Sequence, residues 1–273
     1  MPTFQHQDIE VFYREAGEGE PLLLGHSSTG SSAQWRTFLE SAARHHRVVA
    51  PDHIGYGRSG PYRGARSLLA QELGILESLL VGLGAPTHLV GHSYGGHLLT
   101  RLALRHPDRV RSLTLIEPTL FFLLAEHGRE AEYEEIRLVA DRLDLDVAEG
   151  DPERAARGFI DYWVGQGAYD AMEPRVRDSV SAAIGKVVVE WPSSFEPRGV
   201  GPRTLARLDM PALLLVGTRT TSPARGVVEL LGTMLPDARV VEIPGAGHMG
   251  PVTHAALYEA AIAEFLASLR GER

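Results

Sequence analysis

The chain has 273 residues, of which 44% are hydrophobic and 23% charged, and it carries a formal net charge of −8 with no cysteine. This acidic balance excludes nucleic acid, which needs clustered Lys and Arg, and the missing cysteine excludes a disulfide framework, a thiolate metal site and a cysteine nucleophile. Because the chain has neither a secretory signal nor an apolar stretch of roughly 18 residues, we expect a cytoplasmic protein that binds no membrane.

Short apolar runs alternate with amphipathic stretches along most of the chain. Phe4–Tyr13 alternates apolar and polar residues and predicts an antiparallel hairpin around Gln7 and Asp8. The continuous apolar runs that follow are typical of strands buried on both faces, and the stretches between them predict helices, an alternation that indicates βαβ units. The runs are Leu22–Leu24, Val48–Ala50, Leu89–Gly91, Leu113–Ile116, Leu213–Gly217 and Val240–Ile243, and the helices are Ala33–Arg44, Ser67–Leu83, Gly96–Arg105, Pro223–Leu235 and Thr253–Leu269.

One long segment interrupts this alternation. From about Thr119 to Leu208 the chain shows helical periodicity, many charges and most of its aromatic residues, with a single strand-like run at Lys186–Val189. An insertion of this size between two strands is typical of a helical lid rather than a loop. We therefore predict an α/β fold, in which residues 1–118 and 209–273 form a parallel-rich sheet covered by helices and residues 119–208 form an inserted helical cap.

A predicted strand, a glycine-rich turn and a predicted helix surround Ser93. The segment Gly91-His92-Ser93-Tyr94-Gly95 matches the pattern G-x-S-x-G, whose glycines permit a sharp strand-to-helix turn that lifts the serine hydroxyl above the sheet. The same turn places the Tyr94 backbone N–H at a helix start, where an oxyanion can form. We predict Ser93 as a nucleophile and Tyr94 as an oxyanion donor.

The chain resembles the α/β-hydrolase superfamily, in the branch with a cap after the sixth strand. The resemblance rests on Leu22–Trp35, Pro51–Ser59, Gly91–Gly96 and Pro244–Pro251, which follow in the family's order. It implies an α/β-hydrolase sheet for the core. It also implies that His248, in a glycine-flanked loop after the last strand, is the general base.

The loop Gly25–Gly30 resembles the H-G-x-x-G loop of the same superfamily. Ser27 stands where the family usually has the glycine. By position, the resemblance implies that the Ser28 backbone N–H is the second oxyanion donor beside Tyr94. Each such donor is worth roughly 3 kcal/mol at the transition state.

The triad acid is missing from its usual place in the family. That place is Thr220, and no Asp or Glu occurs between Gly217 and Arg225. Glu117, at the end of the sixth predicted strand, is our candidate acid, in an arrangement that resembles certain dehalogenases and lipases. The structural alternative is that Glu117 caps the start of the helical insertion or pairs with an arginine.

Ser93, His248 and Glu117 together predict acyl transfer through a covalent intermediate. The resemblance also covers haloalkane dehalogenases and epoxide hydrolases, but these need an aspartate at position 93. Aromatic residues of the cap predict an apolar pocket, with Phe121, Phe122 and Trp163 as substrate contacts. We predict a serine hydrolase whose partner is a small-molecule ester with a small or medium apolar acyl or aryl group, and which uses no cofactor and no metal.

The same residues leave other readings open. A lactonase, a carbon–carbon bond hydrolase or a cofactor-free perhydrolase would use the same triad. The missing acid at Thr220 is the one feature that favours a non-catalytic, ligand-binding hydrolase scaffold. The sequence also leaves a homodimer open.

Overall fold

The computed structural model describes residues 2–64 and 66–270, and an eight-stranded sheet forms its centre. The strands follow the order β1-β2-β4-β3-β5-β6-β7-β8 across the sheet. Their bounds are β1 Thr3–His6, β2 Ile9–Ala16, β3 Glu20–Gly25, β4 His46–Pro51, β5 Thr87–His92, β6 Val110–Ile116, β7 Ala212–Gly217 and β8 Ala238–Ile243. β1 pairs with β2, and β2 with β4, in antiparallel register, whereas every pair from β4 to β8 is parallel. The expected hairpin and the parallel-rich sheet are confirmed.

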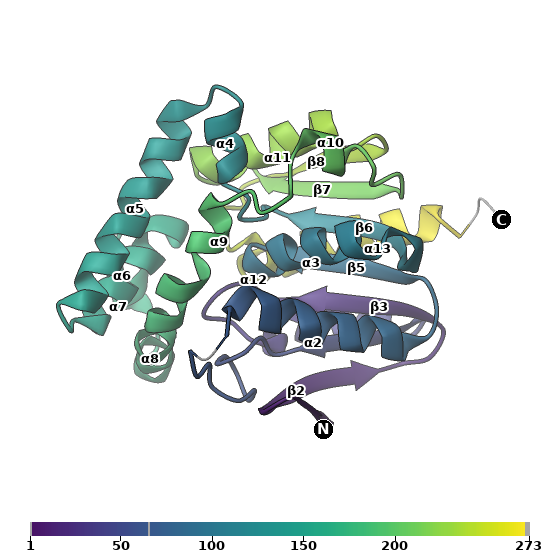
Figure 1. Ribbon diagram of the computed structural model, residues 1–273, viewed down its shortest axis with the longest axis horizontal. Helices are drawn as coiled ribbons and strands as arrows, with labels where there is room; N and C mark the ends of the chain where they lie inside the picture. The colour runs from purple at the N-terminus through teal and green to yellow at the C-terminus, as the bar shows by residue number, and fades with distance from the viewer. Residues whose placement is uncertain (1, 65, 271–273) are drawn as a thin grey trace.

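Helices cover both faces of this sheet (Figure 1). α2 (Leu68–Leu83), α3 (Tyr94–Arg105) and α11 (Ser222–Met234) pack on one face, and α1 (Arg36–Ala42) and α13 (Ala255–Ser268) on the other. Shorter pieces are η1 Ser32–Trp35, η2 Pro107–Arg109 and α12 Gly250–Thr253. Side chains alternate between the faces: Leu23 joins the core cluster under α2 and α3, and Leu22 and Leu24 join the cluster under α1 and α13. Burial on both faces explains the continuous apolar runs in the sequence.

The chain between β6 and β7 forms seven helices and, among the described residues, no strand. They are α4 Phe122–Glu126, α5 Glu130–Ala148, α6 Pro152–Val164, α7 Ala168–Ala171, α8 Pro174–Glu190, α9 Pro192–Phe195 and α10 Pro202–Leu205, and we call them the helical insertion. In Figure 1, α5 to α8 stand together at one side of the sheet. Within the described ranges, no helix is both long and apolar enough to cross a membrane.

The strand expected at Lys186–Val189 is wrong, because these residues lie inside α8. Val180, Ile184 and Val187 are all buried, at the i, i+4, i+7 spacing of one helix face, whereas Val189 is exposed. The run of valines is therefore the end of an amphipathic helix.

Candidate active site

Ser93 occupies the sharp turn between β5 and α3, with φ 54° and ψ −118°. Such a conformation is rare outside glycine and costs about 1–3 kcal/mol. The neighbouring glycines are required by close backbone contacts. A Cβ on Gly91 would lie 2.6 Å from the Gly96 Cα, and one on Gly95 would lie 2.3 Å from the Gly25 carbonyl carbon. The turn expected from the G-x-S-x-G pattern is therefore formed by these residues.

The three residues predicted as a triad lie in one hydrogen-bonded line. His248, in the loop between β8 and α12, has its Nε2 3.0 Å from Ser93 Oγ and its Nδ1 2.7 Å from Glu117 Oε2. An ionised carboxylate can only accept, so Nδ1 carries the proton and Nε2 is left to accept from the serine hydroxyl. All three residues are buried, with Ser93 5% and His248 2% exposed. The arrangement can deprotonate Ser93.

Glu117 follows β6 directly, and its carboxylate is held by the loop after β7. The Gly217 N–H donates to Oε1 over 2.8 Å, and the Thr220 hydroxyl donates to Oε2 over 2.6 Å. With the His248 N–H, three donors offset the cost of burying this charge. Thr220, the position where the family resemblance places the triad acid, is thus a hydrogen-bond donor to Glu117.

His92, which precedes Ser93, is hydrogen-bonded to the loop that carries His248. Its Nε2–H donates to the His248 carbonyl oxygen over 2.8 Å, and its Nδ1 accepts from the Gln34 amide over 3.1 Å. Burial lowers the pKa of His92 well below its usual value, so the ring is neutral and can play both roles. The two residues are 156 positions apart, so the sequence alone did not indicate this contact.

The backbone N–H groups of Ser28 and Tyr94 lie on two segments that are joined next to the nucleophile. The Gly95 N–H donates to the His26 carbonyl oxygen over 3.1 Å, which ties the start of α3 to the loop after β3. Among residues 2–64 and 66–270, neither the Ser28 N–H nor the Tyr94 N–H donates to a protein acceptor. Both donors predicted for the oxyanion are therefore available.

Of the three predicted substrate contacts, Trp163 lies against His248, and Phe121 lies one ring further away, against Trp163. The ring of Trp163, from α6, lies against the His248 ring at an interplanar angle of 30° with centroids 4.0 Å apart, and the Phe121 centroid lies 6.4 Å from that of Trp163. Phe122 instead lies under the Arg101 guanidinium, whose Cζ is 5.9 Å from the centroid of the Phe122 ring. A cavity of about 530 Å³ lies between the loop after β3 and α8; Ser28 and Met249, the neighbour of His248, help to line it, but no triad residue and none of the three predicted substrate contacts does.

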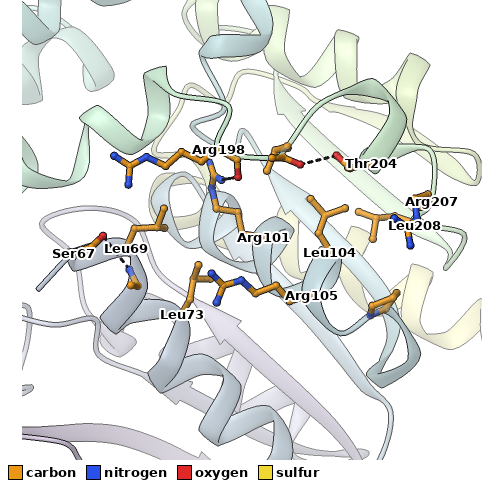
Figure 2. A pocket seen from close by; sticks show the side chains of 14 residues that line it. Ser67, Leu69, Leu73, Arg101, Leu104, Arg105, Arg198, Thr204, Arg207 and Leu208 are labelled. Carbon is orange, nitrogen blue, oxygen red and sulfur yellow. Dashed lines mark hydrogen bonds between the residues drawn. The ribbon is translucent and has the colours of Figure 1, made fainter.

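A second hollow, of about 430 Å³, is lined by residues of α2, α3 and the segment 198–208 (Figure 2). Arg101 contributes to its wall, but its guanidinium is already bound to carbonyl oxygens, among them Glu196 at 3.0 Å and Pro197 at 3.2 Å. No triad residue belongs to the lining. Arg101 therefore holds the end of the helical insertion on α3, apart from the triad.

Comparisons with known proteins agree with this architecture. Residues 20–255 match the family model described as the alpha/beta hydrolase fold. The chain is 32% identical to the pimeloyl-[acyl-carrier protein] methyl ester esterase of Chromobacterium violaceum, over 94% of this chain and 98% of that protein. A solved structure of a thermophilic esterase from Thermogutta terrifontis superposes with a TM-score of 0.74 at 26% identity, covering 96% of this chain and 94% of that one.

Another curated relative matches only in part. The chain is 38% identical over 115 residues to the 2-hydroxy-6-oxo-2,4-heptadienoate hydrolase of Pseudomonas putida. That match spans 40% of this chain and 41% of the relative, less than half the length of either.

Proposed function

The chain belongs to the alpha/beta hydrolase family, and from that premise we propose that it is a hydrolase that cleaves carboxylic esters with Ser93, His248 and Glu117 as its catalytic triad. The observation that carries the proposal is the unbroken line of hydrogen bonds from Glu117 through His248 to Ser93, at 2.7 and 3.0 Å. A buried carboxylate, an imidazole and a serine hydroxyl in this order are the parts that serine acyl transfer requires.

The reaction follows from these contacts. His248 Nε2 takes the proton of Ser93 Oγ as the oxygen attacks the ester carbonyl carbon, and the carbonyl oxygen becomes an oxyanion between the Ser28 and Tyr94 N–H groups. The protonated His248 then gives its proton to the leaving alcohol, which leaves an acyl group on Ser93. Water, deprotonated by His248, attacks the acyl carbon and releases the acid. Glu117 holds the imidazole tautomer and stabilises the imidazolium.

Apolar acyl or aryl esters of small or medium size are the substrates that the surroundings favour. The Trp163 ring lies beside His248 and the Phe121 ring beside Trp163, so aromatic side chains border this face of the triad. The full-length relative is named as a methyl ester esterase, and the superposed structure as an esterase. We further propose that the helical insertion, residues 119–208, acts as a lid over a core of residues 1–118 and 209–273, since Trp163 reaches from α6 onto the triad.

The test is steady-state hydrolysis of p-nitrophenyl butyrate by the wild type, Ser93→Ala and Glu117→Gln. We expect turnover by the wild type, its loss in Ser93→Ala, and a fall on the order of ten-thousandfold in Glu117→Gln. Unchanged thermal unfolding midpoints would show that the variants fold.

Labelling with a fluorophosphonate separates the two parts of the proposal. A wild type that is phosphonylated at Ser93 but hydrolyses no simple ester would keep the nucleophile and reject the ester substrate. Activity retained in Glu117→Gln would remove Glu117 from the triad.

A further inference from the structure

Two charged side chains of α8 are buried against the core domain. Lys186 is 7% and Glu190 0% exposed, and the Lys186 Nζ lies 2.8 Å from Glu190 Oε1, one helical turn away. The same Nζ lies 3.0 Å from Oε1 of Glu72 on α2, which is 1% exposed. Charged residues are almost never buried in this way without a partner, because desolvation costs several kcal/mol per ion. We call these three residues the α8 charge cluster.

The α8 charge cluster touches both residues whose backbone N–H groups are proposed to bind the oxyanion. The Ser28 hydroxyl donates to Glu190 Oε2 over 2.6 Å, although the two residues are 162 positions apart. The Lys186 Nζ lies 5.4 Å from the centroid of the Tyr94 ring and 3.7 Å from that of Tyr56. One turn of a helix in the insertion therefore contacts the side chains of both expected donors.

We propose that Glu190 is a positioning residue, held in place by Lys186, that fixes the Ser28 N–H in the oxyanion hole through the Ser28 hydroxyl. The inference rests on the proposed function, because it assigns a support to the oxyanion hole of the same reaction. Its consequence is that the hole is complete only while α8 packs on the core. The helical insertion thus contributes to the chemistry as well as covering it.

The strength and placement of the Ser28 contact support this role. A hydroxyl-to-carboxylate bond of this length is roughly twice as strong as a neutral one. Lys186 is itself fixed by Glu72, whose Oε1 also accepts the Ile54 N–H over 3.0 Å, so the anchor extends into the core. A shift of about 1 Å in a catalytic group can cost on the order of a hundredfold in rate. Since the oxyanion forms only in the transition state, loss of the anchor must lower kcat and leave KM unchanged.

The experiment compares Ser28→Ala and Glu190→Gln with the wild type in p-nitrophenyl butyrate hydrolysis. Ser28→Ala keeps the backbone N–H and removes only its anchor, and we expect kcat to fall by about 10- to 100-fold with KM within about twofold. Glu190→Gln keeps an acceptor oxygen and should retain more activity than Ser28→Ala. The double variant Ser28→Ala/Glu190→Gln should have the same kcat as Ser28→Ala alone, because the hydrogen bond that Glu190→Gln weakens is already absent.

Inhibition by butylboronic acid tests the oxyanion hole directly, since its tetrahedral adduct on Ser93 places an oxygen there. Its inhibition constant should rise by the same factor by which kcat falls. The matched control is Ser194→Ala, which removes another buried hydroxyl of the insertion, bonded to Thr119 Oγ1 at 3.2 Å. We expect this control to leave kcat and boronate inhibition within about twofold.

Three results would overturn the inference. Ser28→Ala and Glu190→Gln could both keep the kcat and boronate affinity of the wild type, or Ser194→Ala could lose as much as Ser28→Ala. With either of these two results, the proposed function would still stand as long as fluorophosphonate labels Ser93 of the wild type. A wild type that fluorophosphonate does not label would overturn the proposed function, and this inference with it.

Discussion

Thr220 donates its hydroxyl hydrogen to Glu117 Oε2 over 2.6 Å, although 103 positions separate the two residues. Thr220 stands where the resembled family usually has its triad acid, in the loop after β7. The Gly217 N–H of the same loop donates to the other carboxylate oxygen over 2.8 Å. This loop therefore supports a carboxylate that the end of β6 supplies.

Moving the carboxylate back to this loop should restore activity to a chain that lacks it. We expect the double variant Glu117→Gln/Thr220→Asp to have a kcat/KM at least about tenfold higher than Glu117→Gln alone, because a carboxylate again lies near the His248 Nδ1. Thr220→Asp alone should lower kcat/KM, since two carboxylates at hydrogen-bond distance cannot both stay ionised at neutral pH. A double variant no faster than Glu117→Gln would show that only the β6 position orients His248.

The turn at Ser93 should not tolerate a side chain at Gly95. A Cβ there would lie 2.3 Å from the Gly25 carbonyl carbon, so Gly95→Ala must shift the backbone that carries Ser93. We expect hydrolysis and fluorophosphonate labelling to fall by at least about a hundredfold. Gly158→Ala, in α6 with no atom within 4 Å of the new Cβ, is the control and should raise stability by about 0.5–1 kcal/mol without loss of activity. Equal labelling of both variants would contradict the prediction.

Trp163 should limit the size of the acyl group. Its ring covers one face of the His248 ring at 4.0 Å, so Trp163→Ala opens space beside the triad. We expect the ratio of kcat/KM for p-nitrophenyl octanoate over acetate to rise by about tenfold. The truncation should also lower the free energy of unfolding by about 3–5 kcal/mol. For Trp163→Phe we expect both the ratio and the free energy of unfolding to lie between the values of the wild type and Trp163→Ala. An unchanged ratio would place the acyl pocket elsewhere.

Acid should destabilise the fold through His97. Burial, with Arg101 beside it, lowers the pKa of His97 to about 3, and the ring accepts from Arg101 Nε over 2.9 Å. An unfolded histidine has a pKa of about 6.5, so between pH 6.5 and 3 the unfolded state binds the extra proton. The free energy of unfolding should therefore decrease as the pH is lowered from 6.5 to 3, and His97 should account for up to about 1.4 kcal/mol of this decrease per pH unit.

Urea unfolding at pH 7, 6, 5 and 4 checks this prediction. His97→Gln removes the titrating group and should show a shallower dependence of unfolding free energy on pH than the wild type. His92 is also buried with a lowered pKa, so part of the slope should remain in the variant. Identical slopes in the two proteins would contradict the role of His97.

The sequence predicted what depends on neighbours in the chain. Gly91 and Gly95 act within a few residues of Ser93, so the turn is visible as a motif, and Leu22–Leu24 is apolar because both faces of β3 are covered. Contacts between distant segments left no such pattern. Ser28 and Glu190 are 162 positions apart, and nothing in either local sequence marks the pair.

Two other features depended on side-chain direction. Lys186–Val189 reads equally as a strand or as the end of a helix, and only the spacing of the buried Val180, Ile184 and Val187 decides for α8. Phe121 and Phe122 are adjacent in the sequence, yet the first lies beside Trp163 and the second under Arg101. A one-residue difference at the start of α4 sets which ring lies beside Trp163, and composition carries no information on it.

The order of the site residues along the chain also bears on how the protein is made. Ser93 is synthesised 155 residues before His248, an interval of roughly 8–30 s at ordinary elongation rates. Throughout that interval the His248 imidazole, which lies 3.0 Å from Ser93 Oγ in the folded protein, is still missing. On the proposed function, Ser93 therefore gains its general base only after the last strand, β8, has been added and His248 has followed it.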